Sequence, residues 1–170
     1  MTSPPKFPIS KTHPVNIDIL ILSFSRCIAS ECQAGDCNKS AVEYMLKFYS
    51  QAEKLFKTGI VKNLGIADIG ATCFNSLYEK VEIKPSVAQV NISGDSFCDR
   101  PEMIKFSKEH DILLLTHTDV TPFVTSERLN VVLGEKTEIR DIKAAIKYSI
   151  EAKRRAVLLA KGYFLFGEKC

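Results

Sequence analysis

The chain has 170 residues, of which 45% are hydrophobic and 25% are charged, a composition typical of a globular domain with enough apolar side chains for a core. Its formal net charge of +3, from 23 basic and 20 acidic residues, is too small to indicate nucleic acid or a membrane as the main partner. No apolar run reaches the roughly 20 residues of a membrane-spanning helix, and residues 1–14 lack the apolar core of a secretion signal. We therefore expect a cytoplasmic protein with an irregular tail at residues 1–16 and one folded domain over residues 17–170.

The chain contains six cysteines, and the absence of a secretion signal predicts that they are reduced thiols. An intermolecular or regulatory disulfide stays open as the alternative. Cys27, Cys32 and Cys37 are evenly spaced in one polar stretch, whereas zinc sites use closer pairs, so we predict no metal site. Cys98 precedes a predicted helix N-terminus, which stabilises a thiolate, and it is therefore our candidate redox thiol, with an inert half-buried thiol as the alternative.

The first elements after the tail are a strand and a long helix. Residues 17–22 are nearly all apolar and rich in isoleucine and leucine, as in a buried strand. Ser40 and Glu43 form a capping-box pattern, which predicts a helix from this point to a stop at Gly59. The side chains expected on its inner face are Met45, Phe48, Tyr49, Ala52, Leu55 and Phe56.

The middle of the chain continues the alternation of strands and helices. Apolar runs predict strands at residues 60–66 and 86–92, with a short helix at residues 72–81 between them. Asp99 and Glu102 form a second capping pattern at the start of the next helix. The side chains of this helix expected to face inward are Met103, Phe106 and Ser107.

The last third of the sequence predicts two more strands and a late helix. Residues 112–115 form an apolar run typical of a strand, and residues 121–133 are helical or irregular. Thr137 is the expected cap of a long helix that reaches Ile150, and residues 156–159 are the last predicted strand. The apolar positions that repeat at three and four residues in this helix are Ile139, Ile142, Ala145, Ile146, Ser149 and Ile150.

The predicted order of strand and helix, repeated four times before a final strand, indicates an α/β fold with a parallel sheet and crossover helices. Periodicity alone does not choose between an open sheet and part of a closed barrel.

Three segments of the chain are similar to the aldo-keto reductase superfamily. Residues 61–66, followed by Asp68, resemble the end of the fifth strand of that fold. Residues 84–91 resemble its sixth strand, with the proline and glutamine of that strand, and residues 103–115 resemble the next helix and the seventh strand.

A closer resemblance is to one branch, the glutamate–cysteine ligase regulatory (modifier) subunits. It rests on residues 83–85 and 89–91, on Thr116 and His117 after a strand, on residues 146–149, and on residues 161–163 near the end of the chain. The shared order and spacing of all these motifs cover roughly residues 17–163.

The resemblance implies a partial (β/α)8 barrel of the TIM type that corresponds to about strands four to eight. The first three strands have no counterpart, because only 16 residues precede the first predicted strand. Such a sheet has open edges, which aggregate unless they are covered. Truncation of the chain and coverage of the gap by a partner are both open explanations.

The resemblance also implies that reductase catalysis is absent. Aldo-keto reductases use an aspartate, a tyrosine, a lysine and a histidine, and the first three belong to the part without a counterpart. Ser23 aligns with the histidine, and a serine hydroxyl cannot replace an imidazole in proton transfer at neutral pH. We therefore predict no catalytic residues and no enzymatic activity of the chain itself.

Cofactor binding is weakened at the aligned positions as well. Ala67 and Asp68 align with a Ser-Asn pair that holds the nicotinamide amide, and Thr116 replaces the tyrosine that stacks on the ring. Gln89 and Lys161 match a nicotinamide-binding glutamine and a phosphate-binding lysine. Asp68, Gln89 and Lys161 are thus vestigial candidates, and we predict that no cofactor is bound.

Several remaining features are expected to serve structure or recognition. His117 lies at the end of a strand, where we expect a structural hydrogen bond. Residues 153–155, Lys-Arg-Arg, read as a solvated basic helix end or as part of a partner surface. The loops at residues 26–38 and 93–100 are candidates for partner binding.

The function implied by the resemblance is regulation. Modifier subunits bind the catalytic subunit of glutamate–cysteine ligase as a heterodimer, improve its use of glutamate and relieve feedback inhibition by glutathione in the first step of glutathione biosynthesis. The alternative is an NADP(H)-binding aldo-keto-reductase-like oxidoreductase remnant. A third alternative is a truncated product with no stable fold.

Overall fold

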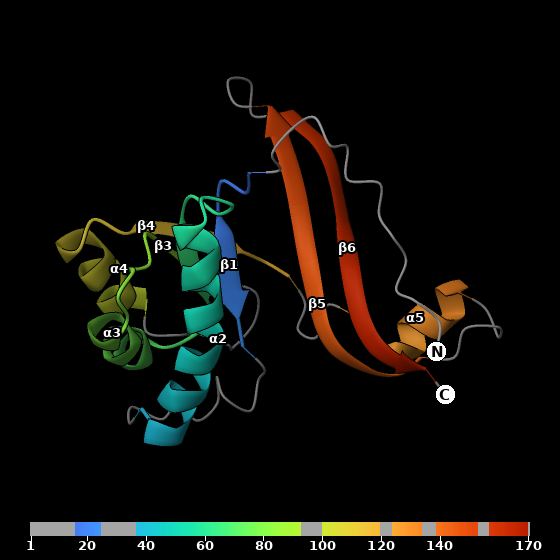
Figure 1. Cartoon of the computed structure of the whole chain (residues 1–170), viewed down its shortest axis with the longest axis horizontal. Helices are drawn as coiled ribbons and strands as arrows, with labels where there is room; N and C mark the ends of the chain where they lie inside the picture. The colour runs from blue at the N-terminus through green and yellow to red at the C-terminus, as the bar shows by residue number, and fades with distance from the viewer. Residues whose placement is uncertain are drawn as a thin grey trace. The chain divides into compact units, whose positions relative to one another are not determined.

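The computed structural model describes residues 16–24, 37–92, 100–119, 124–133, 139–152 and 157–169. The chain divides into two compact units, residues 1–118 and residues 119–170 (Figure 1). Among the described residues, no helix combines the length and the apolar character that crossing a membrane requires.

The first unit contains a parallel sheet of four strands, β1 (Leu20–Ser23), β2 (Leu64–Ala67), β3 (Val87–Asn91) and β4 (Leu113–His117). Their spatial order is their order in the chain, and each strand pairs in parallel with the next. The predicted α/β class with a parallel sheet is therefore confirmed for these four strands.

Three helices, α2 (Lys39–Lys57), α3 (Ala71–Lys80) and α4 (Arg100–Glu109), connect the four strands (Figure 1). Alternate strand residues, such as Leu64, Ile66, Ala88 and Val90, join the buried helix side chains in one hydrophobic cluster. The helices therefore cover the same face of the sheet, as expected when crossovers of one hand link strands in consecutive order. Buried helix side chains in this cluster include Met45, Tyr49, Phe74, Leu77 and Met103.

Helix α2 begins earlier than its capping pattern predicted. The side chain of Asn38, not Ser40, is the N-cap, and its Oδ1 accepts a hydrogen bond from the backbone N–H of Ser40 at 3.0 Å. Asparagine is as good a cap as serine, so the earlier residue takes the role. The predicted stop at Gly59 is confirmed, because this glycine has a φ of +78° just after the helix. Phe48 is exposed rather than buried and contacts the rings of Phe24 and Tyr44 instead.

The second unit contains helix α5 (Ser126–Leu133) and a long antiparallel hairpin of β5 (Ile139–Ala152) and β6 (Val157–Lys169). The helix predicted from Thr137 to Ile150 is therefore wrong over its described residues, and residues 157–159 belong to an antiparallel strand rather than to a fifth parallel one. The physical reason is a double periodicity, because apolar residues also alternate along this segment with period two. The alternating apolar residues are Ile142, Ala144, Ile146, Tyr148 and Ile150.

Two local contacts belong to the second unit. The Thr125 hydroxyl caps α5 by accepting a hydrogen bond from the N–H of Arg128 at 3.2 Å. The ammonium of Lys147 on β5 lies 2.7 and 2.8 Å from the two carboxylate oxygens of Asp119. The ion pair attaches the start of the unit to the middle of its hairpin.

Candidate functional site

The carboxyl ends of the four parallel strands place polar side chains at one edge of the sheet. Ser23 ends β1, Asp68 follows β2, Asn91 ends β3 and His117 ends β4. In open parallel sheets and in barrels, ligands bind at this edge. We refer to Ser23, Asp68, Asn91 and His117 as the Asp68 cluster.

Asp68 is the centre of the cluster because its carboxylate receives groups from the three other strands. Its Oδ1 accepts the backbone N–H of Asn91 at 3.0 Å and lies 2.8 Å from Nε2 of His117. Its Oδ2 accepts the Ser23 hydroxyl at 3.5 Å, which is a long contact. A carboxylate can only accept hydrogen bonds, so Nε2 of His117 carries the shared proton. One side chain thus joins the ends of all four strands.

The backbone of Asp68 is held in an uncommon conformation. Its φ is +61°, in the left-handed region, where aspartate is tolerated better than most residues. Its own N–H donates to the carbonyl of Gln89 at 3.0 Å. These bonds turn the side chain toward β3 and β4. The left-handed backbone conformation costs about 1–2 kcal/mol relative to the ordinary α and β regions.

The geometry does not form a catalytic relay. A nucleophile–base pair needs a hydroxyl or thiol that donates to an imidazole, with the carboxylate behind the imidazole. Here the carboxylate stands between the serine and the histidine, and both donate to it. The side chains of His117 and Asp68 are only 14% and 26% exposed, so the pair is largely enclosed. The cluster fixes the positions of strand ends, and His117 makes the structural hydrogen bond expected from the sequence.

The structure brings together two of the three vestigial cofactor residues. Asp68 and Gln89 are hydrogen-bonded neighbours at the carboxyl edge, through the backbone. Lys161 belongs to the second unit, where it is exposed and stands opposite Ser149 in the hairpin. Thr116 is exposed on β4. Sequence reasoning missed the linking role of Asn91, although the shared position of these residues at strand ends was a usable signal.

A disulfide joins Cys37, just before α2, to Cys73 in the first turn of α3. The prediction of reduced thiols is therefore wrong for this pair, and Cys37 is not a loop thiol open to zinc. Consecutive strand–helix units place equivalent positions side by side, which brings the two Cα atoms to 5.1 Å, within the usual disulfide range. Among the described residues no group of histidine, cysteine, aspartate and glutamate side chains is arranged to hold a metal.

Other predicted positions lie outside the described residues. They are the candidate redox thiol Cys98, the cysteines at 27 and 32, the basic residues 153–155, residues 26–36 of the first candidate loop and residues 93–99 of the second. Cys98 as a redox thiol and both loops as partner surfaces stay predictions.

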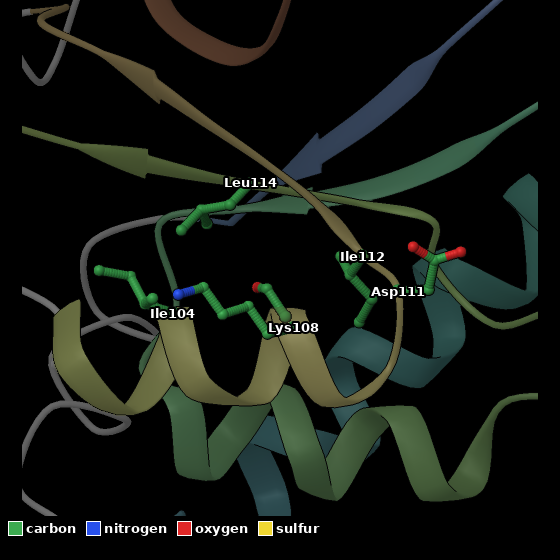
Figure 2. Close-up of a pocket in the computed structure, with 6 residues that line it drawn as sticks. Ile104, Lys108, Asp111, Ile112 and Leu114 are labelled. Atoms are coloured by element: carbon green, nitrogen blue, oxygen red, sulfur yellow. The ribbon is translucent and has the colours of Figure 1, made fainter.

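A hollow of about 350 Å³ lies between α4 and β4 of the first unit (Figure 2). Its walls are mostly apolar, and the Asp111 carboxylate points away from the Lys108 ammonium. The Ser107 side chain is buried, as predicted, but its hydroxyl has no hydrogen-bond partner in the part of the chain that the structure describes. These groups do not supply an acid–base pair, so we assign no chemistry to the hollow. Its lining residues are Ile104, Ser107, Lys108, Asp111, Ile112 and Leu114.

The class of protein defined by these features is an α/β protein with a consecutive parallel sheet and a hydrogen-bonded polar cluster at its carboxyl edge. The chain is 29% identical to the glutamate–cysteine ligase regulatory subunits of Mus musculus and Homo sapiens, over 74% of this chain and 47% of each relative. It is also 30% identical, over 74 residues, to the NADPH-dependent alpha-keto amide reductase of Saccharomyces cerevisiae, which covers 44% of this chain and 24% of that protein. No family model and no solved structure matches the chain significantly.

The predicted resemblance to glutamate–cysteine ligase regulatory subunits, and more distantly to aldo-keto reductases, is therefore confirmed. The chain spans about half the length of the regulatory subunits that it matches.

Proposed function

We propose that this chain is a non-catalytic regulatory protein that binds the catalytic subunit of glutamate–cysteine ligase and modulates its activity in glutathione biosynthesis. The observation that carries the proposal is the similarity to named regulatory subunits over 74% of the chain. If the chain bound one conformational state of the catalytic subunit more tightly than another, it would raise the population of the state that it prefers. The expected compartment is the cytoplasm, with no nucleic acid and no membrane as a partner.

The geometry of the carboxyl edge supports a role without turnover. Ser23 stands where the resemblance places a reductase histidine, and its hydroxyl donates to the Asp68 carboxylate rather than to an imidazole. Both oxygens of Asp68 accept hydrogen bonds from the protein itself. A nicotinamide amide at this point would have to compete with Asn91 and His117 for the same carboxylate, and an ionised carboxylate has no proton to donate to the amide oxygen.

We also propose that the four-stranded sheet is a portion of an aldo-keto-reductase-type barrel. The strands follow one another in consecutive order and the helices lie on one face, which is how a (β/α)8 barrel is wound. Doubly wound sheets instead reverse the strand order and place helices on both faces.

The proposed function is tested by mixing the purified chain with the catalytic subunit and measuring γ-glutamylcysteine formation. We expect co-elution in gel filtration, a lower KM for glutamate and weaker inhibition by glutathione. Separate elution together with unchanged kinetics contradicts the proposal.

The second candidate, an NADP(H)-binding remnant, is favoured by one observation. The side-chain amide of Gln89 makes no hydrogen bond within the described residues and so is available to a ligand. NADPH fluorescence titration separates the candidates. We expect no saturable binding at micromolar concentrations. Binding in that range, lost in both Gln89→Ala and Lys161→Ala, would establish the remnant instead.

A further inference from the structure

The Cys37–Cys73 bond joins the starts of two helices of the first unit. Cys37 comes directly before Asn38, the N-cap of α2, and Cys73 is the third residue of α3. Both helices begin at the carboxyl edge of the sheet, because each follows a strand of the parallel set. Proteins with parallel sheets place their chemistry at that edge, so the pair occupies a position suited to a reactive group.

The two cysteines of the bond differ in access to solvent. Cys73 is 0% exposed, whereas Cys37 is partly exposed at the margin of the hydrophobic core. An attacking thiolate needs access to one sulfur of a disulfide, and Cys37 offers it. Attack there makes the sulfur of Cys73 the leaving group. An accessible cysteine beside a partner that can re-form the bond is the arrangement of a redox-sensing thiol with its resolving cysteine.

The start of α3 stabilises the leaving sulfur. A helix N-terminus carries partial positive charge, which favours a thiolate and offsets the cost of burying it. The N-cap of α3 is Gly70, which has no side chain to accept hydrogen bonds from the first-turn N–H groups, and this turn contains no acidic residue. The partial charge of the helix start is therefore available to the sulfur of Cys73.

The start of α2, next to Cys37, has the same electrostatic character. Its first turn also lacks an acidic residue, whereas Glu102 and Glu127 occupy the first turns of α4 and α5. Among the described helices, the two joined by the bond are thus the two without a carboxylate at their start. Because both helix starts favour thiolates, they favour the reduced pair and make the bond easier to reduce.

We propose that Cys37 and Cys73 form a reversible thiol–disulfide pair, in which Cys37 is the site of exchange with low-molecular-weight thiols and their disulfides. In reduction, a thiolate attacks Sγ of Cys37, the bond to Cys73 breaks, and its electron pair leaves on Sγ of Cys73. A second thiolate then attacks the small-molecule sulfur of the mixed disulfide, which releases Cys37 and forms the small disulfide.

Two small thiols thus become one small disulfide, and their two protons pass through solvent to the two protein sulfurs. Oxidation is the reverse reaction, with the small disulfide as the oxidant. The inference is independent of the proposed function.

The first test uses the full-length wild type and glutathione as the probe. The chain is equilibrated at neutral pH with about 5 mM glutathione and about 0.05 mM of its disulfide, and the Cys37–Cys73 peptide is then quantified by alkylation and mass spectrometry. We expect at least about half of the chains to have lost the bond, as for a reactive disulfide. Fewer than about one chain in ten, with full reduction once urea unfolds the protein, would identify a static structural bond and overturn the inference.

The second test identifies the sulfur that exchanges. Cys73→Ser and Cys37→Ser are treated with glutathione disulfide, and the adducts are mapped by mass spectrometry. We expect the adduct on Cys37 in the first variant to form at least about tenfold faster than the adduct on Cys73 in the second, because Cys73 is buried. Equal rates overturn the assignment of Cys37. If either variant lacks a cooperative urea transition, the wild-type measurement decides.

The third test changes the charge at the start of α3. Thr72 is exposed in the first turn, so Thr72→Glu places a carboxylate beside Cys73 without altering the core, and Thr72→Gln is the neutral control of the same shape. With 2-mercaptoethanol as the probe, we expect the bond to be reduced about two- to fivefold more slowly in Thr72→Glu than in Thr72→Gln. Equal rates would overturn the role of Cys73 as the stabilised leaving group.

Discussion

The two units of the chain use β-structure in opposite ways. In the first unit every strand is parallel to the next, is linked through a helix, and sends alternate side chains into a common core. In the second unit two long strands pair directly with each other and leave large apolar side chains about half exposed. The comparison indicates that the first unit, with its common core, holds most of the folding free energy.

The largest expected effect comes from comparing one phenylalanine of each unit, which tests whether the first unit holds most of the folding free energy. Phe74 on α3 is 1% exposed and contacts Phe106 edge to face, so Phe74→Ala should lower the free energy of unfolding by about 3–5 kcal/mol. Phe166→Ala, on β6, where the side chain is 56% exposed, should change it by no more than about 0.5 kcal/mol. Urea denaturation of the free chain measures both. Similar losses would show that the Phe166 side chain is buried in the free protein and would contradict the comparison.

The next effect concerns the disulfide of the first unit. The bond closes a loop with a sequence separation of 36 residues, which predicts a stabilisation of about 2–4 kcal/mol. Cys37→Ser should lose that amount under oxidising conditions. In dithiothreitol the wild type and Cys37→Ser should have equal denaturation midpoints, and a remaining gap between them would mean that the serine itself disturbs the start of α2.

Two glycines, one in a strand of each unit, test which unit is more tightly packed. A Cβ on Gly65 of β2 would lie 2.9 Å from the Cβ and from the carbonyl oxygen of Val87 on the neighbouring strand, so Gly65→Ala should cost about 1–3 kcal/mol. A Cβ on Gly162 of β6 would meet the phenol of Tyr148, whose end can move aside. We therefore expect Gly162→Ala to cost less than half as much in the same denaturation assay. The reverse ranking would mean that the hairpin is the more tightly packed unit.

The smallest effect is a pH dependence confined to the first unit. Burial, assisted by the carboxylate of Glu53, raises the pKa of Tyr49 well above its usual range, and its hydroxyl donates to the carbonyl of Ile83 at 2.9 Å. Above pH about 10 the unfolded chain releases a proton that the folded chain keeps, so stability should fall as the pH rises.

Tyr49→Phe should lose about 1 kcal/mol at neutral pH and show less of this alkaline decline. Tyr44→Phe, at an exposed ring on the same helix, is the control and should follow the wild type at every pH. If the free energy of unfolding fell equally steeply with rising pH in Tyr49→Phe and the wild type, the alkaline decline could not be assigned to Tyr49.

The elements of the first unit were largely predictable from the sequence. The apolar run at residues 17–22 predicted a strand, and β1 covers Leu20–Ser23, although Ile17 and Ile19 are exposed rather than buried. The inward positions of Met45 and Tyr49 follow one helical face. The hairpin could not be predicted from the sequence, because Ile142, Ile146 and Ile150 are spaced by four residues. That spacing is close to one helical turn and is also twice the period of a strand, so it fits both structures. The partner strand decided the outcome by placing Phe164 opposite Ile146.

The candidate site was predictable in part. The resemblance placed Asp68 and Gln89 at one edge, and the expected hydrogen bond of His117 is present. The convergence on one carboxylate depends on the left-handed turn at Asp68, which has no signature in a sequence with aspartate at that position. The Cys37–Cys73 bond depends likewise on the side-by-side placement of two helix starts that are distant in the chain.

The consecutive order of the parallel strands has a consequence for how the protein is made. Each strand–helix unit needs only the one before it as a template, so the sheet can be assembled step by step from β1 to β4 as the chain leaves the ribosome. The last two strands require no such template, because their contacts are local in sequence and local contacts form rapidly. Biosynthesis would therefore complete the slow, long-range part of the molecule first and leave the fast hairpin to close last.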